Sequence, residues 1–122
     1  MGRKILIIDD DPDLHGLLRV VLSKAGHTVI SAMDAMQGPM MARQNSPDLI
    51  LLDISMPGGG GATVYRRLRQ LTTTLHIPIV ICSAKSRQEI EKDLPEAARE
   101  TILTKPAKPE AVLAAVKDAL GE

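Results

Sequence analysis

Apolar residues alternate along the chain between short continuous runs and longer stretches with helical spacing. The run Ile5-Leu6-Ile7-Ile8 is unbroken and rich in β-branched residues, as expected for a strand covered on both faces. The next stretch spaces its apolar residues at three and four positions, which is typical of an amphipathic helix, at Leu14, Leu17, Leu18, Val21 and Leu22. The same alternation continues to the end of the chain. It predicts strands at residues 5–8, 27–31, 49–52, 79–82 and 101–104, each followed by a helix.

Capping residues mark where several of these helices should begin and end. Asp11 and Pro12 supply an N-cap and a first-turn proline, and Gly26 lies where the first helix should end. The second helix is predicted from Asp34 to about residue 45, but Gly38-Pro39 within it indicates a late start or a kink. The remaining helices are predicted after a loop at residues 57–61, near Arg87, and from Pro109 to a closing Gly121.

The composition allows one domain, residues 1–122, with an almost entirely aliphatic core. Apolar residues make up 44 % of the chain, but Tyr65 is the single aromatic residue. Met33, Met36 and Met40 fall on one predicted helical face. We expect these methionines to fill the core in place of aromatic side chains rather than to form a groove for a partner.

Charge and cysteine content exclude some classes of function. Fifteen basic and fifteen acidic residues cancel, which argues against direct nucleic acid binding and against an anionic membrane surface as a partner. Cys82 is the only cysteine and is predicted to be buried in a strand. No run approaches the roughly 18 apolar residues of a membrane span, and the start is too short for a signal peptide, so a cytoplasmic location is expected. The three histidines show no metal-ligand spacing and are predicted at the surface: His15, His27 and His76.

Alternating strands and helices predict an α/β domain with a parallel sheet and helices on both faces. The pattern alone leaves the order of the strands open. Ligands of such sheets bind outside the carboxyl ends of the strands, so the residues that follow each strand are the candidates for chemistry. These residues are Asp9, Asp10 and Asp11 after the first strand, Asp53 after the third, Ser83 after the fourth and Lys105 after the fifth.

Such a set of groups suits a metal-assisted phosphoryl transfer. Carboxylates that lie together repel one another unless a cation is present, and Mg²⁺ suits a site with one or two carboxylates and phosphate oxygens. Lys105 could supply a positive charge and Ser83 a hydrogen bond to the same oxygens, while Asp53 could act as the nucleophile. Taken singly, the residues have simpler explanations: the acids at 9–11 as helix caps, Asp53 as a turn residue, and Lys105 as a solvated side chain.

At this point the sequence resembles the response regulator receivers, the CheY-like domains of two-component signalling. The matching segments are in the family's order and spacing, and the resemblance covers the whole chain. They are Ile5-Leu6-Ile7-Ile8-Asp9-Asp10-Asp11, the run from Pro47 to Pro57 around Asp53, Ser83-Ala84 and Lys105-Pro106. Each motif is weak alone, but the four together are specific.

The resemblance implies a fold and a set of roles. The fold would be a single doubly wound (βα)5 flavodoxin-like domain, with a five-stranded parallel sheet of order 2-1-3-4-5 and a cis Lys105-Pro106 bond. The roles would be Asp53 as phosphoacceptor, Asp10 and Asp53 as Mg²⁺ ligands with the backbone carbonyl of Ser55, Asp9 as a support of the metal through its waters, Ser83 as a donor to a phosphoryl oxygen, and Lys105 as the partner of the phosphate.

It also implies partners. A sensor histidine kinase or a phosphotransfer protein would supply the phosphoryl group, and an output domain or target protein would respond. The domain would catalyse only its own phosphorylation and dephosphorylation. One departure is Ile102, which stands where the family often has an aromatic residue that moves on phosphorylation. The resemblance therefore does not predict the usual route of the signal to the output surface.

Two other functions are open at this stage. A small phosphatase of the haloacid dehalogenase type also uses an aspartate nucleophile and Mg²⁺, but such sites want a second acid where this chain has Ser55. A binding module with receiver shape and no phosphorylation is the other alternative. Retention of the acids, Ser83 and Lys105 argues against it, whereas Ile102 argues for it.

Overall fold

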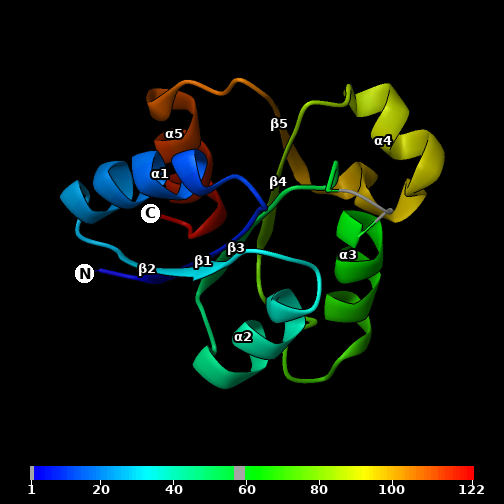
Figure 1. Ribbon diagram of the computed structural model, residues 1–122, viewed down its shortest axis with the longest axis horizontal. Coiled ribbons are helices and arrows are strands. Elements are labelled where there is room, and N and C mark those ends of the chain that lie inside the picture. The colour runs from blue at the N-terminus through cyan, green and yellow to red at the C-terminus, as the bar shows by residue number, and fades with distance from the viewer. Residues whose placement is uncertain (1, 57–59) are drawn as a thin grey trace.

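A computed structural model describes residues 2–56 and 60–122 of the chain and shows five strands that alternate with five α-helices (Figure 1). The strands are β1 (Lys4–Ile8), β2 (Thr28–Ala32), β3 (Leu49–Leu52), β4 (Ile79–Ser83) and β5 (Thr101–Thr104). The helices are α1 (Pro12–Lys24), α2 (Gln37–Asn45), α3 (Gly60–Gln70), α4 (Arg87–Asp93) and α5 (Pro109–Ala119). A short 3-10 helix, η2 (Pro95–Arg99), follows α4 and was not predicted.

All strand pairs in the sheet are parallel, and their order is β2-β1-β3-β4-β5. The doubly wound α/β fold and the strand order implied by the resemblance are therefore confirmed. The predicted strands agree with the observed ones to within one residue at each end. The cis Lys105-Pro106 bond is also present.

Helices cover both faces of the sheet and create two hydrophobic clusters. Helices α1 and α5 lie together on one face, and α2 and α3 lie on the other (Figure 1). Because side chains alternate along a strand, neighbouring residues of one strand enter different clusters. Ile5 and Ile7 of β1 pack under α1 and α5, whereas Leu6 and Ile8 pack under α2 and α3.

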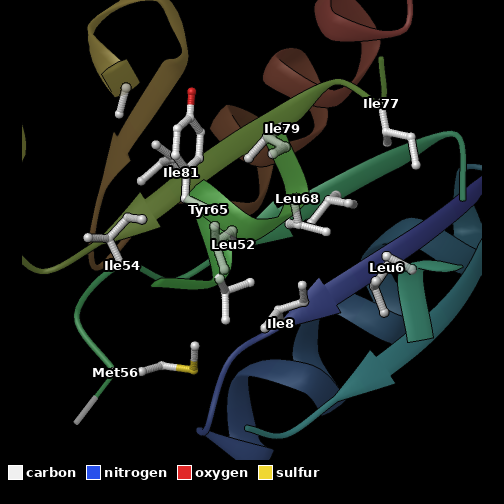
Figure 2. Close-up of a cluster of buried hydrophobic side chains, with 14 of the residues drawn as sticks. Leu6, Ile8, Leu52, Ile54, Met56, Tyr65, Leu68, Ile77, Ile79 and Ile81 are labelled. Atoms are coloured by element: carbon white, nitrogen blue, oxygen red, sulfur yellow. The ribbon is translucent and has the colours of Figure 1, made fainter. Parts of the chain in front are cut away.

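The cluster under α2 and α3 contains one aromatic ring among its otherwise non-aromatic apolar side chains (Figure 2). Tyr65 of α3 is fully buried, and its hydroxyl donates to Glu100 Oε2 at 2.7 Å. Burial and the adjacent carboxylate raise the pKa of this phenol. Arg69 also pairs with Glu100, at 2.8 Å. The predicted core of Leu, Ile, Val, Ala and Met is thus confirmed, with Tyr65 linking α3 to the start of β5.

Helix α1 has the predicted caps but a different buried face. The Asp11 side chain accepts from the Asp13 N–H, and Gly26 after the helix has a positive φ of 92°. Leu17, predicted to face the core, is 50 % exposed. His15, predicted at the surface, is buried, because its ring is hydrogen-bonded at both nitrogens.

Helix α2 corrects the prediction for the methionines. The helix starts late, at Gln37, and buries Gly38, Pro39 and Ala42. A Cβ at Gly38 would lie 3.1 Å from Ile8 side-chain carbons, so glycine allows the helix to pack closely on β1. The methionine face is thereby turned outward: Met36 is 86 % exposed and Met40 is 41 % exposed, while Met33 is only half-buried.

The predicted loop at residues 57–61 is wrong for its last two residues. Gly60 and Gly61 form the first turn of α3, and Pro57, Gly58 and Gly59 lie outside the described residues. A Cβ at Gly61 would clash with the backbone of Asp53 and Ile54. Glycine therefore lets the start of α3 pack directly against the segment that carries Asp53. None of the helices in the described ranges is long and apolar enough to span a membrane.

Candidate functional site

The carboxyl ends of four strands bring the predicted polar residues to one edge of the sheet. Asp9 follows β1, Asp53 follows β3, Ser83 ends β4, and Lys105 follows β5. The backbone ladder extends past the strands, since the Asp53 N–H donates to the Ile8 carbonyl at 3.0 Å and the Lys105 N–H to the Ser83 carbonyl at 2.8 Å. These bonds fix where each side chain leaves the sheet, and the common edge predicted from the sequence is confirmed.

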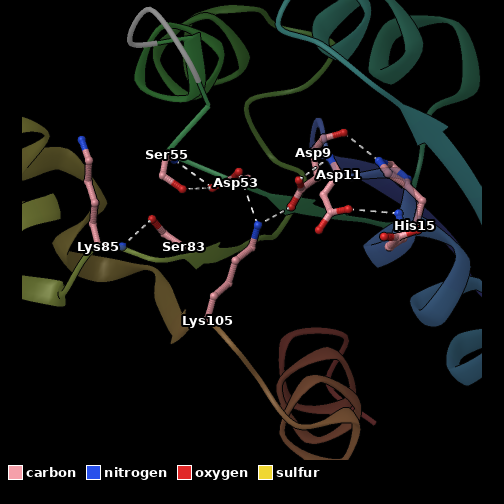
Figure 3. A network of polar contacts seen from close by, with 9 residues as sticks. Asp9, Asp11, His15, Asp53, Ser55, Ser83, Lys85 and Lys105 are labelled. Atoms are coloured by element: carbon pink, nitrogen blue, oxygen red, sulfur yellow. Dashed lines mark hydrogen bonds and ion pairs between the residues drawn. The ribbon is translucent and has the colours of Figure 1, made fainter.

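Lys105 lies between two carboxylates from different strands (Figure 3). Its ammonium nitrogen donates to Asp9 Oδ2 at 2.7 Å and is 3.4 Å from Asp53 Oδ2. Both carboxylates are buried, whereas the lysine side chain is 23 % exposed. A positive charge in this place can hold an anionic group that approaches either acid.

Asp53 is held in one orientation by the chain that follows it. Its Oδ1 accepts from the Ser55 N–H at 2.8 Å and from Ser55 Oγ at 2.6 Å. Its Oδ2 is on the side of Lys105 (Figure 3). The carboxylate of Asp53 is therefore both buried and oriented, as a nucleophile or a metal ligand needs to be.

Three carboxylates come together at this edge and could hold a metal ion. Ligand oxygens of Asp9, Asp10 and Asp53 lie within 4.8 Å of one another. When ionised they carry three negative charges, and Lys105 balances one, which leaves two. Oxygen ligands with a double negative charge match a hard divalent cation such as Mg²⁺. Asp10 is the exposed member, so an ion could approach from solvent on its side.

The surroundings of the cluster shift two pKa values upward. Burial raises the pKa of Asp9, and the Asp53 charge adds to this, although the bonds from Lys105 and the Asp11 N–H oppose it. Burial alone would lower the pKa of Lys105, but the bond to Asp9 and the charge of Asp53 outweigh it, so the net shift is upward. Lys105 thus stays cationic, and the site as a whole disfavours a further negative charge unless a cation is present.

Replacing Asp9 by asparagine should raise the melting temperature of the metal-free protein at neutral pH. An acid whose pKa is raised by folding opposes folding once it is ionised, and this cost vanishes below the pKa of the unfolded chain, about 3.9. The gain in melting temperature should therefore be largest near pH 7 and fade below about pH 4. Calorimetry over this pH range measures it. Asp11→Asn is the matched control, since asparagine also caps helices and this side chain lies outside the acidic cluster; an equal gain there would contradict the explanation.

Ser83 lies at the expected strand end, with its own hydrogen bond. The side chain is fully buried, and its Oγ accepts from the Lys85 N–H at 3.1 Å. Its bond is thus to the loop that leads into α4 rather than to the acids. The predicted contact of Ser83 with a phosphoryl oxygen stays a prediction. The same holds for the Ser55 carbonyl as a metal ligand, since the contacts described for Ser55 are made by its N–H and hydroxyl.

His15 is a site-supporting residue that the sequence reasoning missed. Its Nε2 must donate to the backbone carbonyl of Asp9, at 2.8 Å, because a carbonyl only accepts. Its Nδ1 is 2.9 Å from Ser31 Oγ on β2. The spacing of His15, Leu18 and Leu22 at i, i+3 and i+7 placed it on the buried helical face and could have shown this.

Cys82 is buried at the end of β4, as predicted. Burial raises the pKa of its thiol, and the nearby Lys105 opposes the shift only in part. A thiol with a raised pKa is a poor nucleophile at neutral pH, so we assign Cys82 a structural role as a buried side chain beneath the site.

Comparisons with known proteins agree with this geometry. The family model described as response regulator receiver domain matches residues 5–117. The transcriptional regulator RpaA of Synechocystis is 38 % identical over 114 residues, which are 93 % of this chain and 47 % of RpaA. Protein PilH of Pseudomonas aeruginosa is 38 % identical over 119 residues, 96 % of this chain and 97 % of PilH.

A solved structure shares the fold at lower identity. The receiver domain of the sensor histidine kinase PA1611 from Pseudomonas aeruginosa superimposes with a TM-score of 0.88 and 24 % identity, covering all of both chains. That structure has a magnesium ion coordinated in its active site cleft. The match covers most of this chain but only about half the length of RpaA.

Proposed function

Because the chain belongs to the response regulator receiver family, we propose that Asp53 is the residue that takes the phosphoryl group of its two-component system. The observation that carries this assignment is the environment of Asp53. It is a buried carboxylate held by two hydrogen bonds from Ser55, with a lysine ammonium 3.4 Å away. Among the acids at this edge, Asp10 is exposed and Asp9 is already bonded to Lys105 and the Asp11 N–H.

The transfer would form one bond and break one bond at phosphorus. A carboxylate oxygen of Asp53 attacks the phosphorus of the donor and forms an acyl phosphate. The bond from phosphorus to the donor breaks, and the leaving group keeps its electron pair; it is an imidazole nitrogen for a histidine kinase and an acetate oxygen for acetyl phosphate. Lys105 stabilises the charge on the phosphoryl oxygens, since its ammonium already lies between Asp9 and Asp53.

A divalent cation completes the proposed site. Asp10 and Asp53 would bind Mg²⁺ directly together with the Ser55 carbonyl, and Asp9 would support the ion through its waters. When bound, the ion offsets the two uncompensated negative charges and shields the incoming phosphoryl group. Support comes from the all-oxygen cluster of three carboxylates and from the magnesium ion in the similarly folded PA1611 domain.

The two alternative functions fit the site less well. At the position where a dehalogenase-type phosphatase wants its second acid, the hydroxyl of Ser55 is bonded to Asp53 Oδ1 at 2.6 Å. A module that binds without phosphorylation would have no use for two buried carboxylates beside a lysine. Such groups are costly to bury and are retained where they act.

Phosphorylation should require both a small donor and a divalent cation. Incubation with acetyl phosphate and Mg²⁺ should add one phosphoryl group to the intact protein, as measured by mass spectrometry. Excess chelator should suppress the product, because the two uncompensated negative charges of the acidic cluster would repel the anionic donor. Equal labelling with chelator present would show that the acidic cluster does not act through a metal.

We expect Ser83 to be needed for the conformational response to phosphorylation but not for the phosphorylation itself. The Ser83 hydroxyl oxygen accepts from the Lys85 N–H, and its O–H could donate a charge-assisted hydrogen bond to a phosphoryl oxygen. The variant Ser83→Ala should therefore still be labelled by acetyl phosphate but should lose most of the change in amide hydrogen exchange that beryllofluoride, a phosphoryl mimic, causes around residues 83–90. Ser23→Ala, on the exposed side of α1, is the control and should retain the change. An unchanged response in Ser83→Ala would remove this residue from the switch.

Membership of the family indicates the classes of protein that would be partners, but not the particular proteins. A sensor histidine kinase or phosphotransfer protein would supply the phosphoryl group in the cytoplasm, and an output domain or target protein would respond. Ile102 of β5 is partly buried against the α2 and α3 side of the core, where an aliphatic side chain cannot make the inward rotation of an aromatic ring. We therefore expect a smaller rearrangement at the β5 face on phosphorylation than in receivers with an aromatic residue there.

A further inference from the structure

An open groove lies between α2 and α3. The two helices contact each other beneath it and lie side by side in Figure 1. Its walls are Ala35, Met36, Pro39, Met40 and Arg43 on the α2 side, and Arg67 and Leu71 on the α3 side. From Met36 to Arg43 the α2 wall is eight residues long, which is about 10 Å, or two helical turns.

The groove contains two of the large apolar side chains that are exposed among the described residues. Met36 is 86 % exposed and Met40 is 41 % exposed, and they lie one helical turn apart on the same side of α2. Single exposed apolar residues are ordinary, but neighbouring ones that line a groove mark an interaction surface. Methionine suits such a surface because its flexible side chain adapts to the shape of a partner.

The charged residues around the groove are distributed unevenly along it. Both charged residues in its wall are arginines, Arg43 and Arg67, and both are exposed. Neither guanidinium group makes a hydrogen bond or ion pair with the parts of the chain that the structure describes. At the other end, Ala35 and Met36 also line a shallow hollow that contains Asp10 and Asp34. The groove is therefore basic at one end, apolar along its length and acidic at the end near the candidate metal site.

We propose that this groove binds an amphipathic helix of a protein partner, with apolar residues against Met36 and Met40 and acidic residues against Arg43 and Arg67. A groove between two helices accepts a third helix through apolar residues spaced at i, i+3, i+4 and i+7. The two arginines lack partners among the described residues, and carboxylates on the flank of the helix would supply them. Asp34 and Asp10 exclude further acidic residues from the other end, so the helix binds in one orientation.

This surface is separate from the phosphoryl chemistry of Asp53. None of the seven residues that line the groove belongs to the acidic cluster or to its hydrogen bonds, although Asp10 of that cluster lies in the adjoining hollow. Binding of a helix in the groove therefore needs no phosphorylation, and Asp53→Asn should bind it as the unmodified chain does.

A designed peptide tests the proposal. The probe is a helical peptide of about four turns, with leucines at i, i+3, i+4 and i+7 and glutamates on both flanks near one end. A matched peptide has lysines in place of the glutamates. Titration of the ¹⁵N-labelled protein should give saturable amide shifts confined to α2, α3 and the 33–36 segment for the glutamate peptide, with at least about tenfold weaker binding of the lysine peptide.

Variants separate the apolar and charged contributions. Met36→Ser with Met40→Ser should weaken binding of the glutamate peptide by about tenfold or more, since two apolar contacts are lost. Arg43→Glu with Arg67→Glu should reverse the preference toward the lysine peptide. Leu17→Ser, which removes an exposed apolar side chain of α1, is the matched control and should bind normally.

Several results would overturn the proposal. They are an absence of saturable shifts, shifts centred outside α2 and α3, equal affinity for the two peptides, or insensitivity to the arginine reversal. Concentration-dependent shifts at the groove without any peptide would assign the surface to a second copy of the chain instead.

Discussion

Replacing Asp53 by asparagine should abolish phosphorylation of the chain by acetyl phosphate. The asparagine side chain has the same shape and retains an oxygen that can accept the two hydrogen bonds from Ser55. It lacks the anionic oxygen that attacks phosphorus, and no acyl phosphate can form on an amide. Mass spectrometry of the intact protein should show the added phosphoryl group in the unmodified chain and none in the variant.

The matched control is Asp118→Asn on α5, an exposed carboxylate far along the chain from the acidic cluster. It removes the same charge from the protein and should leave the labelling unchanged. Circular dichroism should confirm that Asp53→Asn is folded. Undiminished labelling of folded Asp53→Asn would show that another residue takes the phosphoryl group.

Replacing Asp10 by alanine should strongly weaken Mg²⁺ binding. The Asp10 carboxylate is the exposed member of the cluster, whereas Asp9 is bonded to Lys105 and Asp53 is bonded to Ser55. Loss of groups that merely support a metal ligand costs about 10- to 100-fold in affinity, so loss of a direct ligand should cost at least as much. Isothermal titration calorimetry with Mg²⁺ measures the change.

Asp11→Ala separates a ligand from a helix cap. The Asp11 side chain accepts from the Asp13 N–H at the start of α1 and lies outside the acidic cluster. Its loss should cost about 1 kcal/mol of folding stability, with nearly normal Mg²⁺ affinity. Similar losses of affinity in Asp10→Ala and Asp11→Ala would contradict the assignment of Asp10 as a metal ligand.

The sheet could be predicted from the sequence because several of its strands contain short, continuous apolar runs, as in β1, β3 and β4. Residues 49–52 are all buried in β3, as expected for a strand that is covered on both faces. The order of the strands was not obtained from the pattern. It came from the resemblance to a family, and the structure has that order.

Helix faces were less predictable where polar residues find partners or small residues control packing. The apolar face predicted for α1 did not include His15, because histidine is polar and its partners cannot be read from the sequence. In the structure its two ring nitrogens are bonded to the Asp9 carbonyl and the Ser31 hydroxyl, which allows the ring to be buried. The methionines of α2 were assigned to the core on hydropathy. The close contact of Gly38 with Ile8 instead set the rotation of that helix and exposed Met36.

For the candidate site, the residues could be predicted from the sequence but the bonds between them could not. Its residues could be found because each follows a strand, and strand ends in a parallel sheet meet at one edge. The bonds between them depend on distances that spacing does not encode. These include the ion pair from Lys105 to Asp9, the Ser55 hydroxyl on Asp53, and the bond from the Lys85 N–H to Ser83.

The central claim is that the phosphoryl group is carried by Asp53, and mapping the modified residue tests it most directly. An acyl phosphate is reduced by borohydride to an alcohol, which marks the modified aspartate permanently. The chain should be phosphorylated with acetyl phosphate and Mg²⁺, reduced, cleaved into peptides and sequenced by tandem mass spectrometry. We expect the mark on Asp53 alone; a mark on Asp9 or Asp10, or an unreduced phosphoryl group on the Ser55 hydroxyl, would contradict the account.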